Sequence, residues 1–357
     1  MKKIVVDARC IFDSGIGVYI SEILTRLIKI DGYKVEIILL NEQLSKFLDL
    51  KIEVNILDIY LVDFGRYSLK NIYTLNKLLL TADVYWMPAL SLTPFSKVRK
   101  IVTVHDLCPI AQWKIFGLPT AFAYWCLLGV QLVLSKNIIC ISKFTQSELS
   151  KYFTSFFKSK SVVVHNGLSN RLTSSSTCNA GVNYSKPYFL CVGNVKPHKN
   201  ILKLVHFFLK NSSYSKSYRL VVVGKVDGFR TGIEQSIDCN ECITFTGFVG
   251  DDELAVLYNN ASAFIFPSFY EGFGLPILEA MSFNLPILVA DIEVFKEVAN
   301  DKVKYFNHYD FSDFDCGLSE LLNSPLSDYS LVLDSFTWER CVINMMSIID
   351  NENSSSK

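Results

Sequence analysis

The chain has 357 residues, too many for one average domain and enough for two of roughly 150 to 180 residues each. Half of the residues are hydrophobic, so the sequence can bury large cores and is not intrinsically disordered. The 35 basic and 35 acidic residues balance, which argues against a nucleic-acid-binding protein held by bulk charge. Ten scattered cysteines within apolar runs indicate small core residues in a reducing compartment such as the cytoplasm.

Short β-branched runs alternate with longer amphipathic segments along the first half of the chain. The N-terminal stretch MKKIVVDARC predicts a first strand, and its apolar run ends at Asp7, unlike that of a secretion signal. Further strands are predicted in order at KVEIILL, DVYWMP, KIVTVHD, NIICIS and SVVVHNG, with helical patterns such as YISEILTRLIKI between them. This alternation predicts a parallel sheet with crossover helices.

The same alternation restarts at YFLCVGN and continues through YRLVVVGK, ITFTGF, AFIFPS and LPILVA. Between the two series lies a polar, serine-rich stretch without periodicity, which predicts a linker. Two doubly wound domains joined in this way imply a cleft that binds ligands beyond the carboxyl ends of the strands. The predicted order is an N-terminal domain over residues 1–168, the linker over 169–187, a C-terminal domain over 188–335, a closing helix over 336–350 and a disordered tail over 351–357.

Residues 115–135 contain no charged side chain. A run of about twenty apolar residues can span a membrane, but Pro119, Thr120 and Gln131 interrupt this one, and a strand follows directly. A buried core helix is the favoured interpretation. A helix in contact with a membrane surface is the alternative, and a true span is the least favoured.

A cluster of basic residues follows the first strand of the second series. In FLCVGNVKPHKN, Lys196, His198 and Lys199 crowd a turn between a strand and a helix. The unpaired N–H groups and the positive dipole end of a helix favour phosphate at such a turn, and the lysines add positive charge. A solvated basic turn is the alternative, and this segment alone does not decide between them.

Two glutamates flank a glycine-rich turn in FPSFYEGFGLPILEAM. Gly272 and Gly274 are predicted in a loop between a strand and a helix, with Pro276 at the first helical position. Glu271 falls on the loop and Glu279 in the first helical turn, where carboxylates can accept hydrogen bonds from the paired hydroxyls of a sugar or ribose. The alternatives are a catalytic acid–base pair and, for Glu279, a surface charge matched to the helix dipole.

Two weaker signals lie in the first domain. In DARCIFDSGIGVYISEI, Gly15 and Gly17 are predicted in a loop that permits close backbone approach to a ligand, although a lone G-x-G is commonly just a tight turn. In KIVTVHDLCPI, His105 and Asp106 fall at the carboxyl end of a strand, where a ligand would lie. A single histidine at such a position is more often structural.

The sequence offers no clear metal site. Cys239 and Cys242 have C-x-x-C spacing, but no second pair or nearby histidines supply the roughly four ligands that zinc needs. The D-x-D of Asp313 and Asp315 falls in a loop-like run and is interpreted as surface charge. We therefore expect no metal and no other cofactor.

In combination these segments resemble the retaining, nucleotide-sugar-dependent glycosyltransferases of family 4, which have the GT-B fold. The resemblance runs along nearly the whole chain and is strongest over residues 243–291, where GFGLPILEAM and the Glu-x7-Glu spacing are distinctive. It implies two Rossmann-like, doubly wound α/β domains that face a central cleft. The other segments that carry it are SGIGVYISEI, TVHD, ISKFTQSEL, VVVHNGL, VGNVKPHKN, LVVVGK and FTWERC.

The resemblance assigns roles to the residues of the glycine-rich turn. Glu271 would bind the hydroxyls of the donor sugar, helped by backbone amides around Phe273, Gly274 and Leu275. Glu279 would hold the ribose. On this view the two carboxylates are hydroxyl clamps at opposite ends of one donor and not an acid–base pair.

The resemblance also assigns phosphate-binding residues. Lys199 matches the phosphate-binding lysine of the family. The family often has an arginine just after the glycine or just before that lysine, where this chain has Asn194 and His198. Either Lys196 or His198 would supply the second cation, and Lys196 is favoured.

In the first domain the resemblance assigns roles to two segments. His105, of the H-D pair, would approach the donor sugar across the cleft. The loop at Gly15 and Gly17 would close over the phosphates and the acceptor.

The resemblance implies a metal-independent hexosyltransferase in which fixed cations stabilise the departing nucleoside diphosphate. The basic turn is similar to that of bacterial mannosyltransferases, which favours GDP-mannose as donor and a polysaccharide or lipid-linked oligosaccharide as acceptor, as in O-antigen, capsule or lipopolysaccharide synthesis. A UDP-sugar donor is the alternative, and a non-catalytic sugar-binding scaffold is a further one. We expect a cytoplasmic protein without a nucleic-acid partner that contacts the inner face of the plasma membrane.

Overall fold

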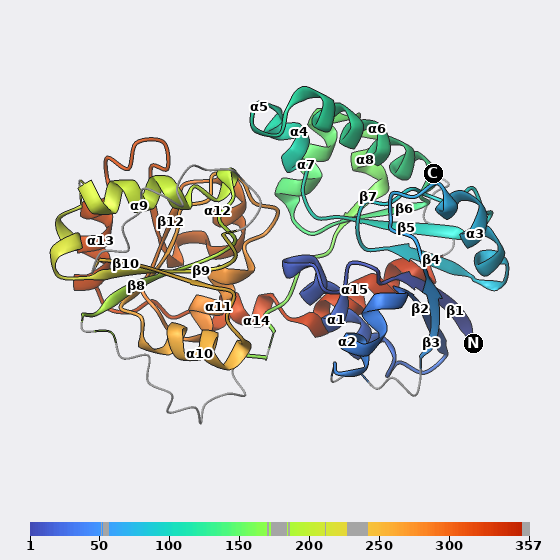
Figure 1. Ribbon diagram of the computed structural model, residues 1–357, viewed down its shortest axis with the longest axis horizontal. Helices are drawn as coiled ribbons and strands as arrows, with labels where there is room; N and C mark the ends of the chain where they lie inside the picture. The colour runs from blue at the N-terminus through green and yellow to red at the C-terminus, as the bar shows by residue number, and fades with distance from the viewer. Residues whose placement is uncertain are drawn as a thin grey trace. The chain divides into compact units, whose positions relative to one another are not determined.

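The chain divides into two compact α/β units in the computed structural model (Figure 1). Unit 1 comprises Met1–Gly167 with Phe336–Lys357, and unit 2 comprises Leu168–Ser335. The structure describes residues 1–50, 52, 57–169, 171–172, 184, 186–210, 212–226 and 242–351. Most of the predicted linker, nearly all of the predicted tail and Cys239 of the C-x-x-C pair lie outside the described residues.

Unit 1 is built on a seven-stranded, all-parallel sheet in the order β3-β2-β1-β4-β5-β6-β7. Its central strands are continuous apolar runs because both faces of a parallel sheet are buried. The edge strand β3 was not predicted. The strands are β1 (Lys2–Asp7), β2 (Tyr33–Leu40), β3 (Asp58–Val62), β4 (Val84–Met87), β5 (Arg99–Val104), β6 (Asn137–Cys140) and β7 (Ser161–Val163).

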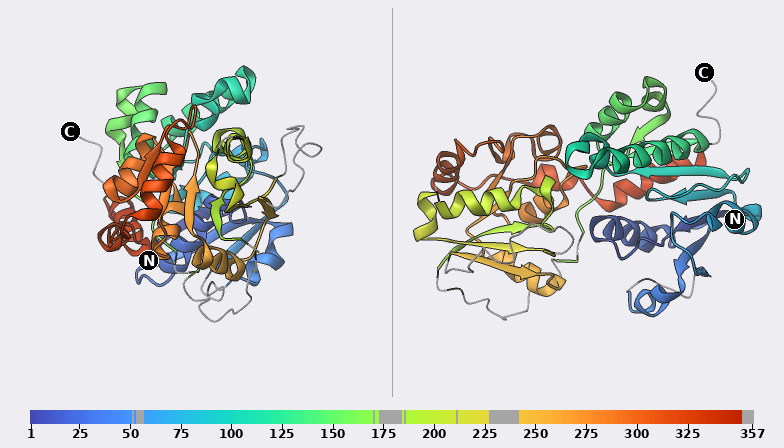
Figure 2. Two further views of the ribbon diagram at one scale, coloured as in Figure 1. Left: turned by 90° about the vertical axis from the view of Figure 1, so that its left-hand side faces the viewer. Right: turned by 45° about the horizontal axis from the view of Figure 1, so that its top comes forward.

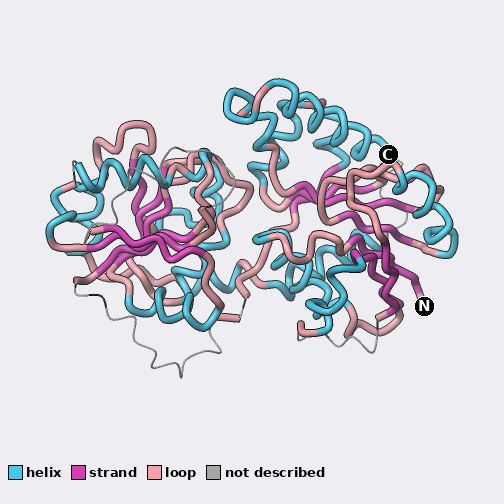
Figure 3. The backbone as a smooth tube through the Cα atoms, in the orientation of Figure 1, coloured by secondary structure: helices cyan, strands magenta, loops and turns pink. Residues whose placement is uncertain are grey.

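Helices cover both faces of this sheet (Figures 2 and 3). The C-terminal helix α15 packs against α1, and Arg99 donates hydrogen bonds to the carbonyl oxygens of Ile348 and Ile349 at the end of α15. The closing helix therefore belongs to unit 1. The helices are α1 (Ser14–Leu27), α2 (Leu44–Leu48), α3 (Lys70–Leu78), α4 (Cys108–Ala111), α5 (Trp113–Phe116), α6 (Leu118–Leu134), α7 (Lys143–Tyr152), α8 (Ser155–Lys160) and α15 (Trp338–Asp350).

The uncharged segment over residues 115–135 forms the end of α5 and all of α6. Four residues of α6 are buried, including Leu128 and Leu132, whereas Leu118, Phe122 and Val133 are each about two-thirds exposed. The favoured interpretation as a buried core helix was wrong, since one face of α6 meets the solvent. Among the described residues, the structure contains no helix with the length and apolar character that a membrane crossing requires.

Unit 2 is built on a six-stranded, all-parallel sheet in the order β10-β9-β8-β11-β12-β13. Only its short edge strand β13 was not predicted. The strands are β8 (Tyr188–Val192), β9 (Arg219–Val223), β10 (Ile243–Gly247), β11 (Ala263–Phe266), β12 (Ile287–Ala290) and β13 (Lys304–Phe306). The helices are α9 (Ile201–Lys210), α10 (Asp251–Asn260), α11 (Leu275–Ser282), α12 (Glu293–Ala299), α13 (Phe314–Asn323) and α14 (Ser330–Ser335).

The strand orders place a topological switch point in each unit. In unit 2 the chain runs outward from β8 through β9 to β10 on one side, and from β11 through β12 to β13 on the other. In unit 1 the equivalent point lies between β1 and β4. Doubly wound sheets bind ligands outside the carboxyl ends of the strands at such points. The basic turn follows β8 and the glycine-rich turn follows β11, so both flank the switch point of unit 2.

Candidate functional site

The loops after β8 and β11 meet through an ion pair. Lys199 ends the short 3-10 helix η5 (Pro197–Lys199), and its Nζ donates to Oε1 of Glu271 at 2.5 Å. The side chains are 20% and 12% exposed. The backbone N–H of Phe269 also donates to the carbonyl oxygen of His198 at 3.0 Å, which fixes one loop against the other. The predicted phosphate-binding lysine and sugar-binding glutamate are thus direct neighbours.

The charges of Lys199 and Glu271 neutralise each other in the structure. A partly buried charge is stable only when it is paired or hydrogen-bonded, and here each charge satisfies the other. The ring of Phe266 lies 5.6 Å from Nζ of Lys199 and closes the apolar side of the pair. A ligand that supplied anionic oxygens to Lys199 and hydroxyl donors to Glu271 would replace this internal pairing without leaving either charge alone.

Glu279 is buried, with 7% of its surface exposed. Its Oε2 accepts a hydrogen bond from the hydroxyl of Tyr258 at 2.9 Å, and its Oε1 accepts one from Nη2 of Arg171 at 3.1 Å. It is the fifth residue of α11, so its predicted place in the first helical turn was wrong, and the surface-charge alternative is excluded. A carboxylate fixed on two sides in this way retains lone pairs that can accept hydroxyl donors.

Arg171 is a residue that the sequence reasoning missed. It falls in the stretch predicted as a linker, where a single arginine carries no periodic or motif signal. Its guanidinium pairs with Glu279 and, at 3.5 Å, with Asp251 at the start of α10. It therefore connects the beginning of unit 2 with two helices of the same unit.

The glycine-rich turn has the backbone geometry that a close ligand contact requires. Gly274 is the N-terminal cap of α11 with a φ of +107°, and a Cβ there would lie 3.0 Å from Cε1 of Phe295. Leu275 begins the helix and Pro276 takes its second position, one residue later than predicted. Phe273 is buried and holds the turn against the core. Pro276 has no backbone N–H and the N–H of Ile277 donates to the carbonyl oxygen of Gly274 at 3.0 Å, so what α11 offers a ligand at the switch point is mainly the positive end of its dipole.

The rest of the basic turn is less constrained. Lys196 caps η5 and is exposed, while Oδ1 of Asn194 accepts the backbone N–H of Lys225 at 3.0 Å. Asn194 is thus used to join the β8 and β9 loops. The choice between Lys196 and His198 as a second phosphate-binding cation stays a prediction.

His105 lies directly after β5 in unit 1. Its Nε2 is 2.7 Å from the carbonyl oxygen of Pro88, which can only accept, so Nε2 carries a proton. The imidazole packs edge-on against Tyr19, with ring centroids 4.9 Å apart. The pKa of His105 is lowered to about 4, chiefly because burial disfavours the cation and to a smaller extent because of the charge of Arg66, and the hydrogen bond to Pro88 offsets part of this effect. The imidazole is therefore neutral at pH 7.

Gly15 and Gly17 do not form a loop before the helix, as was predicted, because both lie in the first turn of α1. A Cβ on Gly17 would stand 2.2 Å from the carbonyl oxygen of Ile11, so glycine is required there by the approach of the preceding turn. A Cβ on Gly15 would meet nothing within 4 Å. The structure thus explains Gly17 by packing alone.

Asp313 of the D-x-D pair is an exposed residue in a turn, as predicted, whereas Asp315 is partly buried, and both make structural hydrogen bonds. Asp313 precedes α13, and its Oδ1 accepts the backbone N–H of Asn307 at 2.8 Å. Asp315 lies in the first turn of α13 and accepts hydrogen bonds from Ser212 and Ser213 at 2.7 to 2.8 Å. In the part of the chain that the structure describes, no three His, Cys, Asp or Glu side chains are grouped to hold a metal ion.

Comparisons with known proteins agree with this architecture. Residues 14–170 match the family model Glycosyltransferase Family 4, and residues 179–329 match the model Glycosyl transferases group 1. The chain is 29% identical over 232 residues to the O-antigen chain mannosyltransferase RfbU of Salmonella typhimurium, which covers 64% of this chain and 62% of that protein. It is 27% identical over 242 residues to the serotype-specific mannosyltransferase WbdA of Escherichia coli, which covers 61% of this chain but only 29% of that protein.

Solved structures establish the fold. The sucrose-phosphate synthase of Thermosynechococcus elongatus superimposes with a TM-score of 0.77 over 98% of both chains at 16% sequence identity. WaaG, a glycosyltransferase involved in lipopolysaccharide biosynthesis, superimposes with a TM-score of 0.66 over 99% of this chain and 96% of that one. At these identities the likeness carries the fold alone, and it confirms the predicted GT-B arrangement of two doubly wound α/β domains. With a family model matching each half of the chain, the protein belongs to the family 4 glycosyltransferases, group 1.

Proposed function

We propose that this protein transfers mannose from GDP-mannose to a polysaccharide or lipid-linked oligosaccharide in bacterial O-antigen, capsule or lipopolysaccharide synthesis. The observation that carries the proposal is the Lys199–Glu271 pair at the switch point of unit 2, since it sets a phosphate-binding cation beside an acceptor for sugar hydroxyls. The two mannosyltransferase relatives support the choice of mannose and of an O-antigen product.

In the proposed mechanism the donor replaces the internal pairing. The diphosphate binds Lys199 at the positive, N-terminal end of α11, the sugar hydroxyls donate to Glu271, and the ribose hydroxyls donate to Glu279. As the sugar–phosphate bond breaks, negative charge grows on the leaving diphosphate, so fixed donors stabilise the transition state more than the ground state. Loss of one such donor typically costs about 3 kcal/mol, or roughly a hundredfold in rate.

The proposal includes retention of configuration without a metal ion. Lys199, joined by Lys196 or His198, would supply the positive charge that a metal gives in other enzymes. The departing phosphate would take the proton of the acceptor hydroxyl in a same-face substitution. A neutral His105 suits a polar contact with the sugar and not a role as general acid at pH 7, because its pKa is lowered to about 4.

A donor panel tests this function. The protein is incubated with an octyl α-mannoside acceptor and, in turn, GDP-mannose, UDP-galactose, UDP-glucose or ADP-glucose, and the product anomer is read by NMR. We expect turnover with GDP-mannose, an α-linked product, insensitivity to EDTA and loss of turnover in Glu271→Gln. Turnover of a UDP-sugar would replace the donor assignment, a β-linked product would refute retention, and turnover by none would favour a non-catalytic scaffold.

We further propose that α5, α6 and α8 rest on an anionic membrane surface, where a lipid-linked acceptor would be met. Leu118, Phe122 and Val133 fall on one face of α6, at positions i, i+4 and i+15. Exposed aromatic side chains from the neighbouring helices extend the patch. Its exposed large apolar residues are Trp113, Ile115, Leu118, Phe122, Trp125, Val130, Val133 and Phe156.

A local excess of lysines favours contact with an anionic membrane surface, although the whole chain has no net charge. Residues 107–160 contain six lysines and a single acidic residue, Glu148, which pairs with Lys151 at 3.0 Å. Each lysine near an anionic bilayer contributes about 1 kcal/mol, in addition to the burial of apolar side chains. The lysines are Lys114, Lys136, Lys143, Lys151, Lys158 and Lys160.

Liposome flotation tests the membrane contact. We expect the protein to float with vesicles containing phosphatidylglycerol, to float less with pure phosphatidylcholine, and to stay soluble when Phe122 and Val133 are both changed to Ser. Leu331→Ser, which removes a 74% exposed apolar side chain from unit 2, is the matched control and should float like the wild type. A wild-type protein that stays soluble with anionic vesicles would refute this contact.

A further inference from the structure

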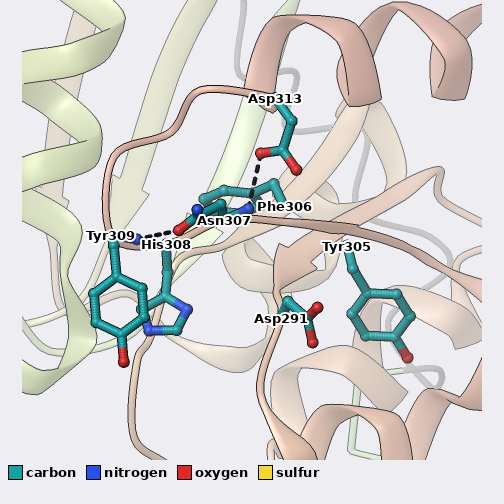
Figure 4. A pocket seen from close by; sticks show the side chains of 7 residues that line it. All are labelled: Asp291, Tyr305, Phe306, Asn307, His308, Tyr309 and Asp313. Atoms are coloured by element: carbon teal, nitrogen blue, oxygen red, sulfur yellow. Dashed lines mark hydrogen bonds between the residues drawn. The ribbon is translucent and has the colours of Figure 1, made fainter.

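A cavity of about 250 Å³ opens in unit 2 beyond the carboxyl ends of β12 and β13 (Figure 4). It lies to one side of the switch point, so it is separate from the Lys199–Glu271 pair. Its walls come from the residue that follows β12, from β13 and the loop after it, and from the residue that precedes α13. The polar residues that line it are Asp291, Tyr305, Asn307, His308, Tyr309 and Asp313.

His308 is the unusual residue of this cavity. Its side chain is 8% exposed, and among the described residues its Nδ1 has no hydrogen-bond partner. Figure 4 shows the imidazole on the cavity wall with one ring nitrogen turned toward the side of Asp291. An unpaired buried nitrogen is costly unless a ligand satisfies it, so this atom marks a position for a hydrogen-bonding group.

The surrounding groups select the chemistry of that ligand. The carboxylate of Asp291 is half-exposed and pairs with Nζ of Lys296 at 2.6 Å, and Asp313 adds a second carboxylate on the opposite wall. Lys296 balances Asp291, Nζ of Lys203 donates to the carbonyl oxygen of Tyr309, and among the described residues no lysine lines the cavity, so the lining offers no positive charge to a phosphate or another anion. The two carboxylates are strong acceptors for hydroxyl donors, and a neutral imidazole can either donate to or accept from a hydroxyl. Burial lowers the pKa of His308, which keeps the ring neutral at pH 7.

An exposed aromatic ring completes the pattern. Tyr309 is 75% exposed, and its ring centroid lies 4.1 Å from that of His308. The backbone N–H of Tyr309 donates to Oδ1 of Asn307 at 2.9 Å, which fixes the turn that presents the ring. A large exposed aromatic side chain beside carboxylates offers an apolar platform for the C–H face of a sugar and acceptors for its hydroxyls.

We propose that this cavity is a subsite for one neutral sugar unit of a glycan, separate from the donor site. The inference rests on the proposed glycosyltransferase function, since it assigns a part of the acceptor or product chain to unit 2. About 250 Å³ is just below the range of small-molecule pockets and suits a single sugar ring.

The subsite is connected to the donor loops. Nδ2 of Asn200, the residue after Lys199, donates to the carbonyl oxygen of His308 at 3.0 Å. The ring of Phe269, two residues before Glu271, is stacked 6.5 Å from the imidazole. A sugar bound against His308 would therefore be linked, through His308, to the turn that positions the Lys199–Glu271 pair.

Saturation-transfer NMR tests the subsite on the whole protein, with methyl α-D-mannopyranoside as probe and with GDP at saturation to fill the donor site. We expect sugar binding in the wild type that weakens about tenfold or more in Asp291→Asn and in Tyr309→Ala, which corresponds to the loss of one charged hydrogen bond or one stacking contact. Tyr73→Ala is the matched control, because Tyr73 is also 75% exposed but lies in unit 1. GDP affinity should be unchanged in all three variants.

Each other outcome overturns the inference or its premise. Sugar binding that survives both subsite variants, or that inorganic phosphate displaces, would refute the subsite. GDP binding without any sugar signal in the wild type would also refute it and leave the proposed function intact. Failure of GDP itself to bind would instead remove the proposed function.

Discussion

The change of Arg171 to methionine tests the geometry around Glu279 most severely. The guanidinium of Arg171 donates to Oε1 of the buried Glu279 at 3.1 Å and lies 3.5 Å from the half-exposed Asp251. Methionine keeps much of the apolar stem and removes the charge. Glu279 would then keep only the Tyr258 hydroxyl, at 2.9 Å, as its donor among these neighbours.

The expected cost follows from burial. Removal of one partner from a fully buried ion pair costs about 3–5 kcal/mol, whereas an exposed pair contributes about 0–1 kcal/mol. The side chains of Arg171 and Glu279 are 33% and 10% exposed, and Tyr258 still donates, so we expect about 2 kcal/mol. Asp251→Asn removes only the long, half-exposed pair and should cost less than about 0.5 kcal/mol. The double variant Arg171→Met/Glu279→Gln should recover most of the loss, because no buried charge remains.

Urea unfolding followed by two probes measures this cost. All four tryptophans lie in unit 1, so tryptophan fluorescence reports the unfolding of unit 1, while far-UV circular dichroism reports both units. The transition that dichroism alone detects is that of unit 2, and it should shift to lower urea in Arg171→Met. If Arg171→Met is no more destabilising than Asp251→Asn, the pairing of Arg171 with Glu279 does not stabilise the site and the reasoning fails.

Three further predictions concern the other site residues. Glu271→Gln removes the carboxylate that pairs with Lys199 at 2.5 Å. GDP, measured by calorimetry, should then bind about fivefold more tightly, although turnover is lost. Weaker GDP binding would contradict the competition between Glu271 and phosphate for Lys199. The pKa of His105 is lowered to about 4 in the folded protein, against about 6.5 in the unfolded chain. Below pH 6.5 the unfolded chain therefore gains a proton that the folded protein does not. The stability that the neutral, buried imidazole contributes is full above pH 6.5 and is lost toward pH 4. Tryptophan-detected stability should therefore fall by about 2 kcal/mol more between pH 7.5 and 5 in the wild type than in His105→Gln, and an equal fall would contradict the burial of the imidazole. Gly17→Ala should destabilise unit 1 in the same unfolding assay, because the new Cβ would lie 2.2 Å from a backbone oxygen. Gly15→Ala places its Cβ in open space and should be neutral or stabilising. Equal effects of the two variants would refute the steric argument.

The central strands of both sheets were predictable because strands buried on both faces are unbroken apolar runs. The two strands that were missed, β3 and β13, lie at sheet edges, where burial is partial and the runs are short or mixed. The exposure of one face of α6 was also missed, because the segment was predicted as a buried core helix. An uncharged segment shows only that no ion is buried, and it does not show which face is covered.

The candidate site was predictable where a motif fixed the backbone. The glycine-rich turn, Glu271 and Lys199 follow strand ends, and the strand order brings those ends together. Arg171 was missed because its partner is 108 residues away in the sequence, and only the folded chain brings the two together. Gly15 and Gly17 were assigned to a loop because a G-x-G does not distinguish a ligand loop from the first turn of a helix.

The central claim is that unit 2 binds the guanosine diphosphate portion of the donor through Lys199. Isothermal titration of the protein with GDP and with UDP, repeated on Lys199→Met, tests it most directly. We predict selective GDP binding in the wild type and a loss of about a hundredfold in the variant, the equivalent of one charge-assisted contact to phosphate. Selective UDP binding, or GDP binding that Lys199→Met leaves unchanged, would contradict the account.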